Sequence, residues 1–349
     1  MKTSIDLGRP TLALRTRAVS GRLYARSLLV CAALLALGAV LAVVALGLGD
    51  YPVAPADVVS VFFGGGRRAQ RLVVLDWRMP RVLLALMLGA AMGVAGAVFQ
   101  SLTRNPLGSP DIIGFNTGAY TGALVAILLI GGGYCTTAAA SLAGGLGTAA
   151  LVYLLAYRRG VAGFRLIIVG MAIGATLASI NTWLIVRASL DLAMAAAVWG
   201  AGSLNALGWA QVVPVAFGSI VLFAVLFAVA PGMRMLEMGD DAARSLGVRA
   251  EPVRLTLLVL GVGLTALATA AAGPVAFVAL AAPQVARRLV RSSSVPLVAS
   301  GILGAVLLLG ADVVAQRAFA PAQLPVGVVT VSVGGVYLVW LLWREAARR

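Results

Sequence analysis

Long apolar runs, separated by short polar or basic stretches, follow one another along almost the whole chain. About ten of them have the roughly 17–22 residues that an α-helix needs to cross about 30 Å of hydrocarbon. The chain is therefore expected to be an all-α, polytopic membrane protein with about ten transmembrane helices. The expected spans are 28–48, 82–103, 112–131, 136–157, 166–187, 211–231, 254–272, 274–290, 296–316 and 326–343.

Composition and charge support this topology. Hydrophobic residues make up 61% of the 349 residues and charged residues 11%, so most of the chain must lie in lipid. If the N-terminus lies inside and successive loops alternate, 20 of the 27 Lys and Arg residues fall on the inner side. The positive-inside rule then places both termini in the cytoplasm. The net charge of +15 reflects topology and contact with anionic membrane lipids rather than binding to nucleic acid.

A single transmembrane domain, residues 28–343, is expected between a basic cytoplasmic N-terminal segment (1–27) and a cytoplasmic C-terminal tail (344–349). The first apolar run follows a basic start, as in a signal peptide. It is too long for one and no clean small-x-small cleavage site follows it, so we expect a retained first helix. The two cysteines, Cys31 and Cys135, lie in or beside apolar runs and are expected to be packing residues rather than a disulfide pair.

Missing residue types exclude several kinds of chemistry. The chain has no histidine, so Ser-His and Cys-His nucleophile pairs and imidazole metal sites are excluded, and we expect neither catalytic nor metal-binding residues. Lys2 is the only lysine, so no phosphate-binding loop of the Walker type can form, and any ATP must be bound by another chain. An ion-coupled secondary carrier would normally keep ionisable groups near mid-membrane. Carboxylates are scarce inside the expected spans, and Asp312 lies near the outer end of its run rather than at mid-membrane. This scarcity counts against an ion-coupled carrier.

A polar break interrupts the apolar pattern between the second and third runs. Asn105, Pro106 and Leu107 directly follow a helix of small residues, and a new apolar segment starts soon afterwards. Lipid cannot pair free backbone groups, so a polar break at membrane depth must be buried in protein or line a watery path. The break therefore indicates a conduit. The plainer alternatives are a helix cap for Asn105 and a simple helix break for Pro106.

The most charged interior stretch covers residues 231–254, on the expected inner side. Two glycines bracket a short expected helix that has acidic residues in its first turn and a basic residue later, an order that complements the helix dipole. These residues are Gly239, Asp240, Asp241, Arg244 and Gly247. Three apolar side chains could enter a groove on a cytosolic partner, and these are Leu236, Met238 and Leu246. An ordinary solvated loop is the alternative.

Three of the seven arginines on the expected outer side, where positive charge is disfavoured, lie close together, and these are Arg67, Arg68 and Arg71. They could meet acidic residues of an extracytoplasmic binding protein and steer its docking. Contact with lipid headgroups or solvent is the alternative, and no motif decides between the two.

The second apolar run carries a row of small residues. Gly89, Gly93 and Gly96 are spaced to share one helix face, which would let a neighbouring helix approach closely. We expect this face to serve packing.

Several separated motifs, taken in order, resemble the FecCD-type permeases of ABC importers for iron-siderophores, haem and cobalamin. The motifs are Arg78-Met79-Pro80-Arg81, Gly96-Ala97-Val98-Phe99-Gln100, Asn105-Pro106-Leu107-Gly108-Ser109-Pro110-Asp111, Phe164-Arg165-Leu166-Ile167, Asn181-Thr182-Trp183, Trp199, Gly202-Ser203-Leu204-Asn205, Leu236-Glu237-Met238-Gly239-Asp240-Asp241, Gly273-Pro274-Val275-Ala276-Phe277 and Leu324-Pro325-Val326-Gly327-Val328-Val329-Thr330. The resemblance covers nearly all of the chain after the first thirty residues. Within the family the chain is most similar to permeases for ferric enterobactin and related catecholate siderophores.

The resemblance implies a type II ABC importer permease fold in the cytoplasmic (inner) membrane. It implies two permease subunits around one path, the second expected to be a different subunit. It also implies two cytosolic ATPase subunits, which bind ATP and Mg²⁺, and an extracytoplasmic siderophore-binding protein. The implied cargo is an iron-siderophore complex of the catecholate type, with haem or cobalamin as the alternative and an ion-coupled carrier as a more distant one.

Residue by residue, the resemblance assigns two sites. Residues 232–253 look like the family's segment for coupling to the ATPase, with Leu236, Gly239, Asp240, Asp241, Arg244, Leu246 and Gly247. The turn of Asn105, Pro106 and Leu107 resembles the family's inner gate. Two departures stand out, since the family often has Pro-His at Pro283-Gln284 and a Gly-x-Pro turn at Gly334-Gly335-Val336. The second departure weakens any transfer of detail to the last helix.

Overall fold

The structure is a computed structural model that describes every residue except 1–10, 16–19, 132, 158–162, 321 and 347–349. Parts of the expected N-terminal segment and C-terminal tail therefore lie outside the described residues. In chain order the elements are β1 (Thr11–Arg15), β2 (Ser20–Tyr24), α1 (Ala25–Gly47), α2 (Pro55–Phe62), α3 (Arg68–Arg71), η1 (Leu72–Arg78), α4 (Met79–Thr103), α5 (Phe115–Val125), η2 (Ala126–Ile130), α6 (Tyr134–Ala156), α7 (Gly163–Arg187), α8 (Leu190–Gly200), α9 (Trp209–Glu237), α10 (Asp240–Ser245), α11 (Ala250–Ala272), α12 (Val278–Val290), α13 (Leu297–Arg317) and α14 (Val326–Ala346).

Membrane-length helices dominate the fold. Among the described residues, seven helices are long and apolar enough to cross a membrane. Three shorter apolar helices accompany them, at Phe115–Ile130, Leu190–Gly200 and Val326–Tyr337. The expected all-helical, polytopic membrane fold is therefore confirmed. Both cysteines are free, as expected, with Cys135 exposed and Cys31 partly buried.

Several local features differ from the apolar pattern. The expected span 274–290 is helical only from Val278 onward, because Gly273 and Phe277 both adopt positive φ angles and leave an extended break between α11 and α12. The helix α8 lies where no element was expected. The N-terminal segment contains an antiparallel hairpin, β1 with β2, in which Thr11 pairs with Tyr24. The helix expected from residue 82 begins earlier, since α3, η1 and α4 are continuous over Arg68–Thr103.

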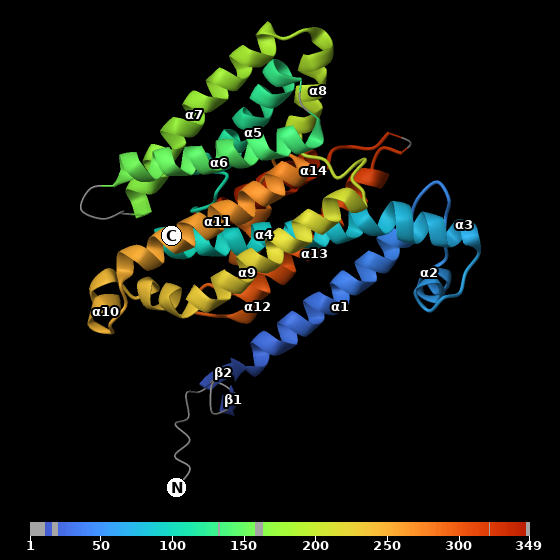
Figure 1. Cartoon of the computed structure of the whole chain (residues 1–349). Helices are drawn as coiled ribbons and strands as arrows, with labels where there is room; N and C mark the ends of the chain where they lie inside the picture. Colours follow the sequence, from blue (N-terminus) through green and yellow to red (C-terminus); the bar gives the residue numbers. More distant parts are fainter. Residues whose placement is uncertain (1–10, 16–19, 132, 158–162, 321, 347–349) are drawn as a thin grey trace.

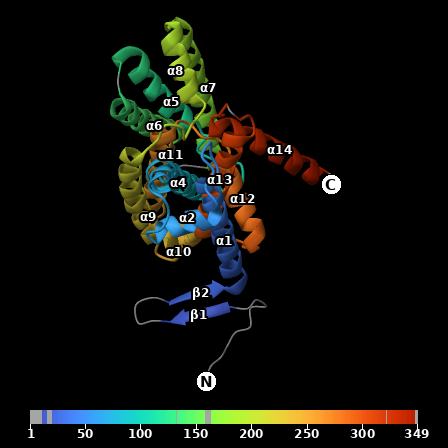
Figure 2. The ribbon, with the colours of Figure 1, turned by 90° about the vertical axis from the view of Figure 1, so that its right-hand side faces the viewer.

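The helices form a central group around α4 and a second layer beside it. The central helix α4 packs against α13, α11, α12 and α9, while α5, α6, α7 and α8 lie together on one side (Figures 1 and 2). In Figure 2 the last helix, α14, extends away from the rest. Figure 1 shows α10 at one end of the bundle and the short helices α2 and α3 at the other.

Small residues let the central helices touch backbone to backbone. A side-chain carbon on Gly93 would collide with the Ser300 carbonyl oxygen of α13, and one on Gly96 would collide with the Ala279 carbonyl oxygen of α12. Next to this contact, the buried Gln100 Nε2 donates to the Leu280 carbonyl oxygen at 3.0 Å. These contacts confirm the expected packing role of the glycine face. In lipid, such close van der Waals packing takes the place of the hydrophobic driving force between helices.

Two arginines of the Arg-Met-Pro-Arg motif fasten the end of the bundle near α2. Arg78 donates to the Leu46 carbonyl oxygen at 2.8 Å and to the Tyr51 carbonyl oxygen at 2.7 Å, so it satisfies backbone groups where α1 ends. Arg81 forms a two-pronged pair with the fully buried Asp312, with N–O distances of 2.9 and 2.8 Å. The one deeply buried carboxylate of α13 is therefore neutralised inside the protein.

We expect Gly96→Ala to destabilise the protein by about 1–3 kcal/mol, because the added methyl group overpacks the contact between α4 and α12. The matched control is Gly147→Ala in α6, where no described atom lies within 4 Å of the new carbon. Alanine favours helix over glycine by about 1 kcal/mol, so this control should be neutral or stabilising. Thermal unfolding in detergent measures both changes. Equal midpoints for the two variants would contradict the packing role of Gly96.

Candidate functional site

The short helix α10 has the bounds that the sequence predicts. Gly239 precedes it with φ 119° and Gly247 follows it with φ 82°, both in the region that favours glycine. The Ala243 N–H donates to the Gly239 carbonyl oxygen at 2.9 Å, and the Val248 N–H donates to the Ala243 carbonyl oxygen at 2.9 Å. Since Ala243 is fully buried, α10 is anchored on one side and exposed on the other.

The exposed side of α10 and its flanks combines charge with apolar surface. The Asp241 side chain is 100% exposed and pairs loosely with Arg244 within the same helix at 3.4 Å. Met238 and Leu246 are each 60% exposed, so large apolar side chains lie on the surface beside this charged helix. Leu236 differs from the expectation, because it is buried in the core and cannot belong to this exposed surface.

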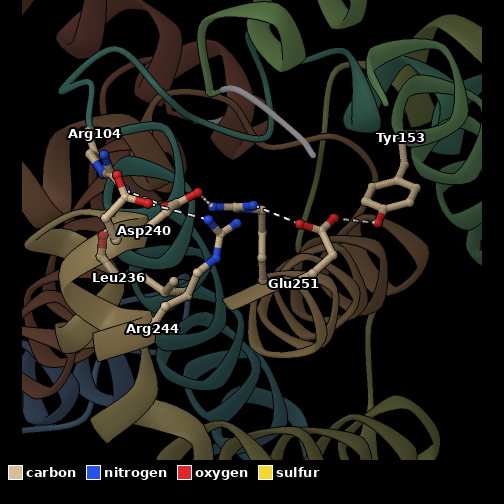
Figure 3. A network of polar contacts seen from close by, with 8 residues as sticks. Arg104, Tyr153, Leu236, Asp240, Arg244 and Glu251 are labelled. Atoms are coloured by element: carbon tan, nitrogen blue, oxygen red, sulfur yellow. Dashed lines mark hydrogen bonds and ion pairs between the residues drawn. The ribbon is translucent and has the colours of Figure 1, made fainter. Parts of the chain in front are cut away.

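Asp240 points inward and joins a network of polar contacts (Figure 3). Its Oδ1 accepts from Arg104 Nη2 at 2.8 Å, and its Oδ2 accepts from Arg254 Nη2 at 2.7 Å. Arg254 also donates to Glu251 at 2.9 Å, and the Tyr153 hydroxyl donates to the same carboxylate at 2.9 Å. The network thus connects α10 to the end of α4, to α11 and to α6.

The pKa of Asp240 reflects this setting. Partial burial by itself raises the pKa of this carboxyl, but the hydrogen bond and charge of Arg254 and the charge of Arg104 outweigh burial, so the pKa lies below the ordinary value of 3.8. Asp240 is therefore ionised at neutral pH and holds both guanidinium groups.

The Asn-Pro-Leu turn (Asn105, Pro106 and Leu107) joins α4 to the segment before α5. Asn105 Oδ1 accepts from the Leu107 N–H at 2.9 Å, so the side chain closes the turn locally. Gln284 Nε2 of α12 donates to the Pro106 carbonyl oxygen at 2.8 Å. Gln284 stands where the family often has histidine, and it supplies a hydrogen bond to the turn. The Leu107 side chain is 46% exposed.

A polar cavity of about 230 Å³ borders this turn. Its lining comes from α4, the turn, the end of α9, α12 and the segment before α13. The lining residues are Gln100, Ser101, Arg104, Asn105, Pro106, Glu237, Arg287, Ser293 and Val295. The polar break therefore faces a polar space, which fits a break that lines a watery path.

Asp111 ties the segment after the turn to the break between α11 and α12. Its Oδ2 accepts from the Phe277 N–H at 3.1 Å, and its Oδ1 accepts from Asn116 Nδ2. Asn116 Oδ1 in turn accepts from the Thr269 hydroxyl at 3.1 Å. Two backbone breaks, far apart in sequence, are thus held together by one carboxylate.

The three outer arginines lie on and beside α3, at the end of the bundle opposite α10 (Figure 1). Arg67, Arg68 and Arg71 are all exposed. Arg71 Nε donates to the Gly65 carbonyl oxygen at 2.8 Å and so stabilises the loop before α3. The structure therefore separates these arginines from α10 by the length of the bundle.

A scan against protein-family models matches residues 34–344 to the FecCD transport family. The match covers far more than half of the chain. The chain belongs to the FecCD transport family. It is thus a multi-pass membrane transport component, as the motifs indicated.

Two relatives of this FecCD chain align over nearly their full lengths. The ferric enterobactin transport system permease protein FepG of Escherichia coli (strain K12) is 47% identical over 93% of this chain and 98% of its own length. The iron(3+)-hydroxamate import system permease protein FhuG of Bacillus subtilis (strain 168) is 34% identical over 86% of this chain and 92% of its own. A solved structure described as an inward-facing metal-chelate type ABC transporter is 26% identical, with a TM-score of 0.81 over 90% of this chain and 99% of that chain.

Sequence reasoning assigned roles to residues of α10 and of the Asn-Pro-Leu turn in this FecCD chain, but not to most of their internal partners. The missed residues are Arg104, Asp111, Tyr153, Glu251, Arg254 and Gln284. Arg104 stands directly before the Asn-Pro-Leu turn, so its position gave a usable signal. Asp111 and Gln284 stand at positions where the family motifs were compared, and Glu251 and Arg254 stand in the charged stretch 231–254, but none of these signals specifies a partner from another helix.

The lowered pKa of Asp240 predicts how acid affects the network. Since the folded pKa lies below 3.8, the ion pairs stabilise the protein fully at higher pH, and this contribution is lost as the pH falls through the folded value. We expect Asp240→Asn to lower stability by about 1 kcal/mol at pH 7, given the partial exposure of the pair. The difference should shrink below about pH 4. Thermal unfolding across pH measures it, and a difference that widens in acid would contradict this assignment.

Proposed function

We propose that this chain is the transmembrane permease subunit of an ATP-driven importer that carries an iron-siderophore complex of the catecholate type. The observation that carries the proposal is the 47% identity to FepG over 98% of its length, since that permease is named for ferric enterobactin. The second relative is named for an iron(3+)-hydroxamate, which is also an iron chelate. We therefore prefer a siderophore to haem or cobalamin as the cargo.

The proposed assembly places this chain beside a second, different permease subunit in the cytoplasmic (inner) membrane. Two cytosolic ATPase subunits bind ATP and Mg²⁺, and an extracytoplasmic binding protein delivers the cargo. Residues 28–343 form the membrane domain, and both termini, including residues 1–27 and 344–349, lie in the cytoplasm. The position of the β1–β2 hairpin and of α10 toward the same end of the bundle supports this orientation (Figure 1).

The exposed side of α10 is the proposed contact with an ATPase subunit. Asp241 and Arg244 offer charge, and Met238 and Leu246 offer apolar side chains that a groove on the ATPase would cover. Gly239 and Gly247 permit the sharp turns that project α10 from the bundle. Within residues 232–253, Leu236 and Asp240 then act inside this chain rather than at the contact.

The Asn-Pro-Leu turn is the proposed inner gate. Its polar cavity, its exposed Leu107 and its hydrogen bond from Gln284 of another helix support a movable constriction rather than a fixed cap. An ion-coupled carrier is less well supported, because the buried Asp312 is already paired with Arg81. Both oxygens of Asp111 likewise already accept hydrogen bonds, from the Phe277 N–H and from Asn116 Nδ2. A coupling-ion site would need a carboxylate that is open to the ion.

Uptake by the complete complex in proteoliposomes tests the reaction. With binding protein, loaded ferric enterobactin and enclosed ATP and Mg²⁺, we expect uptake that a non-hydrolysable ATP analogue does not support. The control is the pair of permease subunits reconstituted without ATPase subunits. Transport by that control at the same rate would overturn the proposal.

Growth of a deletion strain on single iron sources tests the cargo separately. We expect ferric catecholates to require this chain for growth, and ferric hydroxamates, haem and cobalamin uptake to be independent of it. Growth that depends on this chain for hydroxamates alone would reject the catecholate class and leave ATP-driven import intact.

The outer arginines generate a further prediction. If Arg67, Arg68 and Arg71 meet acidic residues on the binding protein, reversing all three to Glu should raise the half-saturating binding-protein concentration by about tenfold or more, and the effect should weaken at high salt. Maximal uptake should be unchanged. An unaltered half-saturating concentration would assign these arginines to solvent and lipid contact.

A further inference from the structure

Asp240 occupies a position that connects the proposed ATPase contact to the proposed gate. The residue is the first of α10, and its Oδ1 accepts from Arg104 Nη2 at 2.8 Å. Arg104 lies between the last residue of α4 and the first residue of the Asn-Pro-Leu turn. Its backbone adopts the left-handed conformation, φ 49°, which turns the chain sharply out of the helix. One ion pair therefore joins α10 to the residue that starts the turn.

The same guanidinium of Arg104 also holds the end of α9. Its Nη2 donates to the Leu236 carbonyl oxygen at 2.9 Å, and Leu236 is buried in the core. Asp240 adds a second attachment through its Oδ2, which accepts from Arg254 of α11 at 2.7 Å. The end of α9, the start of α10 and the first turns of α11 thus meet the segment between α4 and the Asn-Pro-Leu turn at two side chains, Arg104 and Asp240.

The far side of the network is firmly supported. The Arg254 side chain is 9% exposed and is held by Glu251 as well as by Asp240. Glu251 accepts from the Tyr153 hydroxyl of α6 (Figure 3). A buried arginine with two carboxylate partners is held in place, because leaving its buried charge unpaired would cost free energy. Asp240 is therefore held between a fixed guanidinium and one that belongs to the turn.

The neighbouring acidic residue offers a natural contrast. Asp241 is fully exposed, and its 3.4 Å pair with Arg244 stays within α10. Such an exposed pair within one helix transmits no force to another element and stabilises little. Removing one negative charge from Asp241 thus changes the outer side of α10, whereas removing it from Asp240 breaks the link to α4.

We infer that Asp240 is a positioning residue that couples displacement of α10 to the Asn-Pro-Leu turn through Arg104. This inference rests on the proposed function of the chain. The glycines on both sides of α10 let the helix tilt when an ATPase subunit moves against it. Because Asp240 forms an ion pair with Arg104, a tilt of α10 displaces Arg104, which directly precedes Asn105, and so shifts the turn. The ion pair between Asp240 and Arg254 limits how far α10 can move. Without the ion pair, α10 moves and the turn does not follow.

The test compares ATP hydrolysis and uptake in the same proteoliposomes. We expect Asp240→Asn and Arg104→Gln to lower uptake at least tenfold while binding-protein-stimulated hydrolysis stays within twofold, so more ATP is used for each cargo molecule. The double variant should be no worse than either single variant, because both remove one link. Asp240→Glu, which keeps the charge, should restore part of the uptake. The comparison variant is Asp241→Asn, which lies at the proposed ATPase contact. Any change that it makes to ATPase docking should affect hydrolysis and uptake in parallel, so their ratio should stay unchanged.

A second readout follows the turn itself. In a background with Cys31→Ser and Cys135→Ser, a Leu107→Cys variant reports the turn through its rate of thiol labelling. We expect a non-hydrolysable ATP analogue to change this rate in the otherwise unaltered complex and to leave it unchanged with Asp240→Asn. Arg104 is half exposed, so Arg104→Gln provides the same comparison should Asp240→Asn fail to assemble.

The possible failures are distinct. Absence of ATP-dependent uptake in the unaltered complex would reject the proposed function. Two outcomes would overturn the positioning role while the unaltered complex shows ATP-dependent uptake. One is a normal hydrolysis-to-uptake ratio in Asp240→Asn. The other is an equal change of this ratio in Asp240→Asn and Asp241→Asn. A parallel loss of assembly, hydrolysis and uptake in Asp240→Asn and Arg104→Gln would also overturn it, because it would assign both residues to ATPase docking or folding.

Discussion

The fold depends on one constraint, which is that lipid offers no hydrogen bonds to the backbone. Every helix break at membrane depth must therefore be paired within the protein. The break after α4 is closed by Asn105 and anchored by Gln284. The break after α11 is reached by Asp111, which accepts from the Phe277 N–H. The break after α8 pairs with both neighbouring segments, since the Ser203 N–H donates to the Ala272 carbonyl oxygen and the Gly327 N–H to the Gly202 carbonyl oxygen.

The same constraint explains why the proposed gate lies at a helix break. A continuous helix satisfies its own backbone and is stiff, whereas a paired break can exchange one hydrogen bond for another with little cost. Close glycine contacts hold α4 against α12 and α13, so the bundle around the breaks is rigid. In the proposed mechanism, motion is confined to short segments such as the Asn-Pro-Leu turn and α10. A transport protein needs this combination of tightly packed helices and a few short segments that can move.

Local features of the site were accessible from the sequence because they depend on nearby residues. Gly239 and Gly247 define α10, since positive φ angles at both ends favour glycine. The Asn-Pro-Leu turn closes on itself through Asn105. The expected apolar side of the 231–254 stretch was only partly right, because Leu236 is buried while Met238 and Leu246 are exposed. Spacing along one short segment does not reveal which side chains the remaining helices cover.

By itself, the sequence determined that this is a helical membrane protein with a polar break and a charged segment between two spans, because span length and polarity are properties of single segments. Tertiary structure alone decided which charges pair. Asp240 meets Arg104 and Arg254 from two other elements, and Asp312 meets Arg81 across the bundle. Those partners lie 136, 14 and 231 residues away in the chain, respectively. Only the packing of helices fixes such distances, since an ion pair forms wherever folding brings opposite charges within reach.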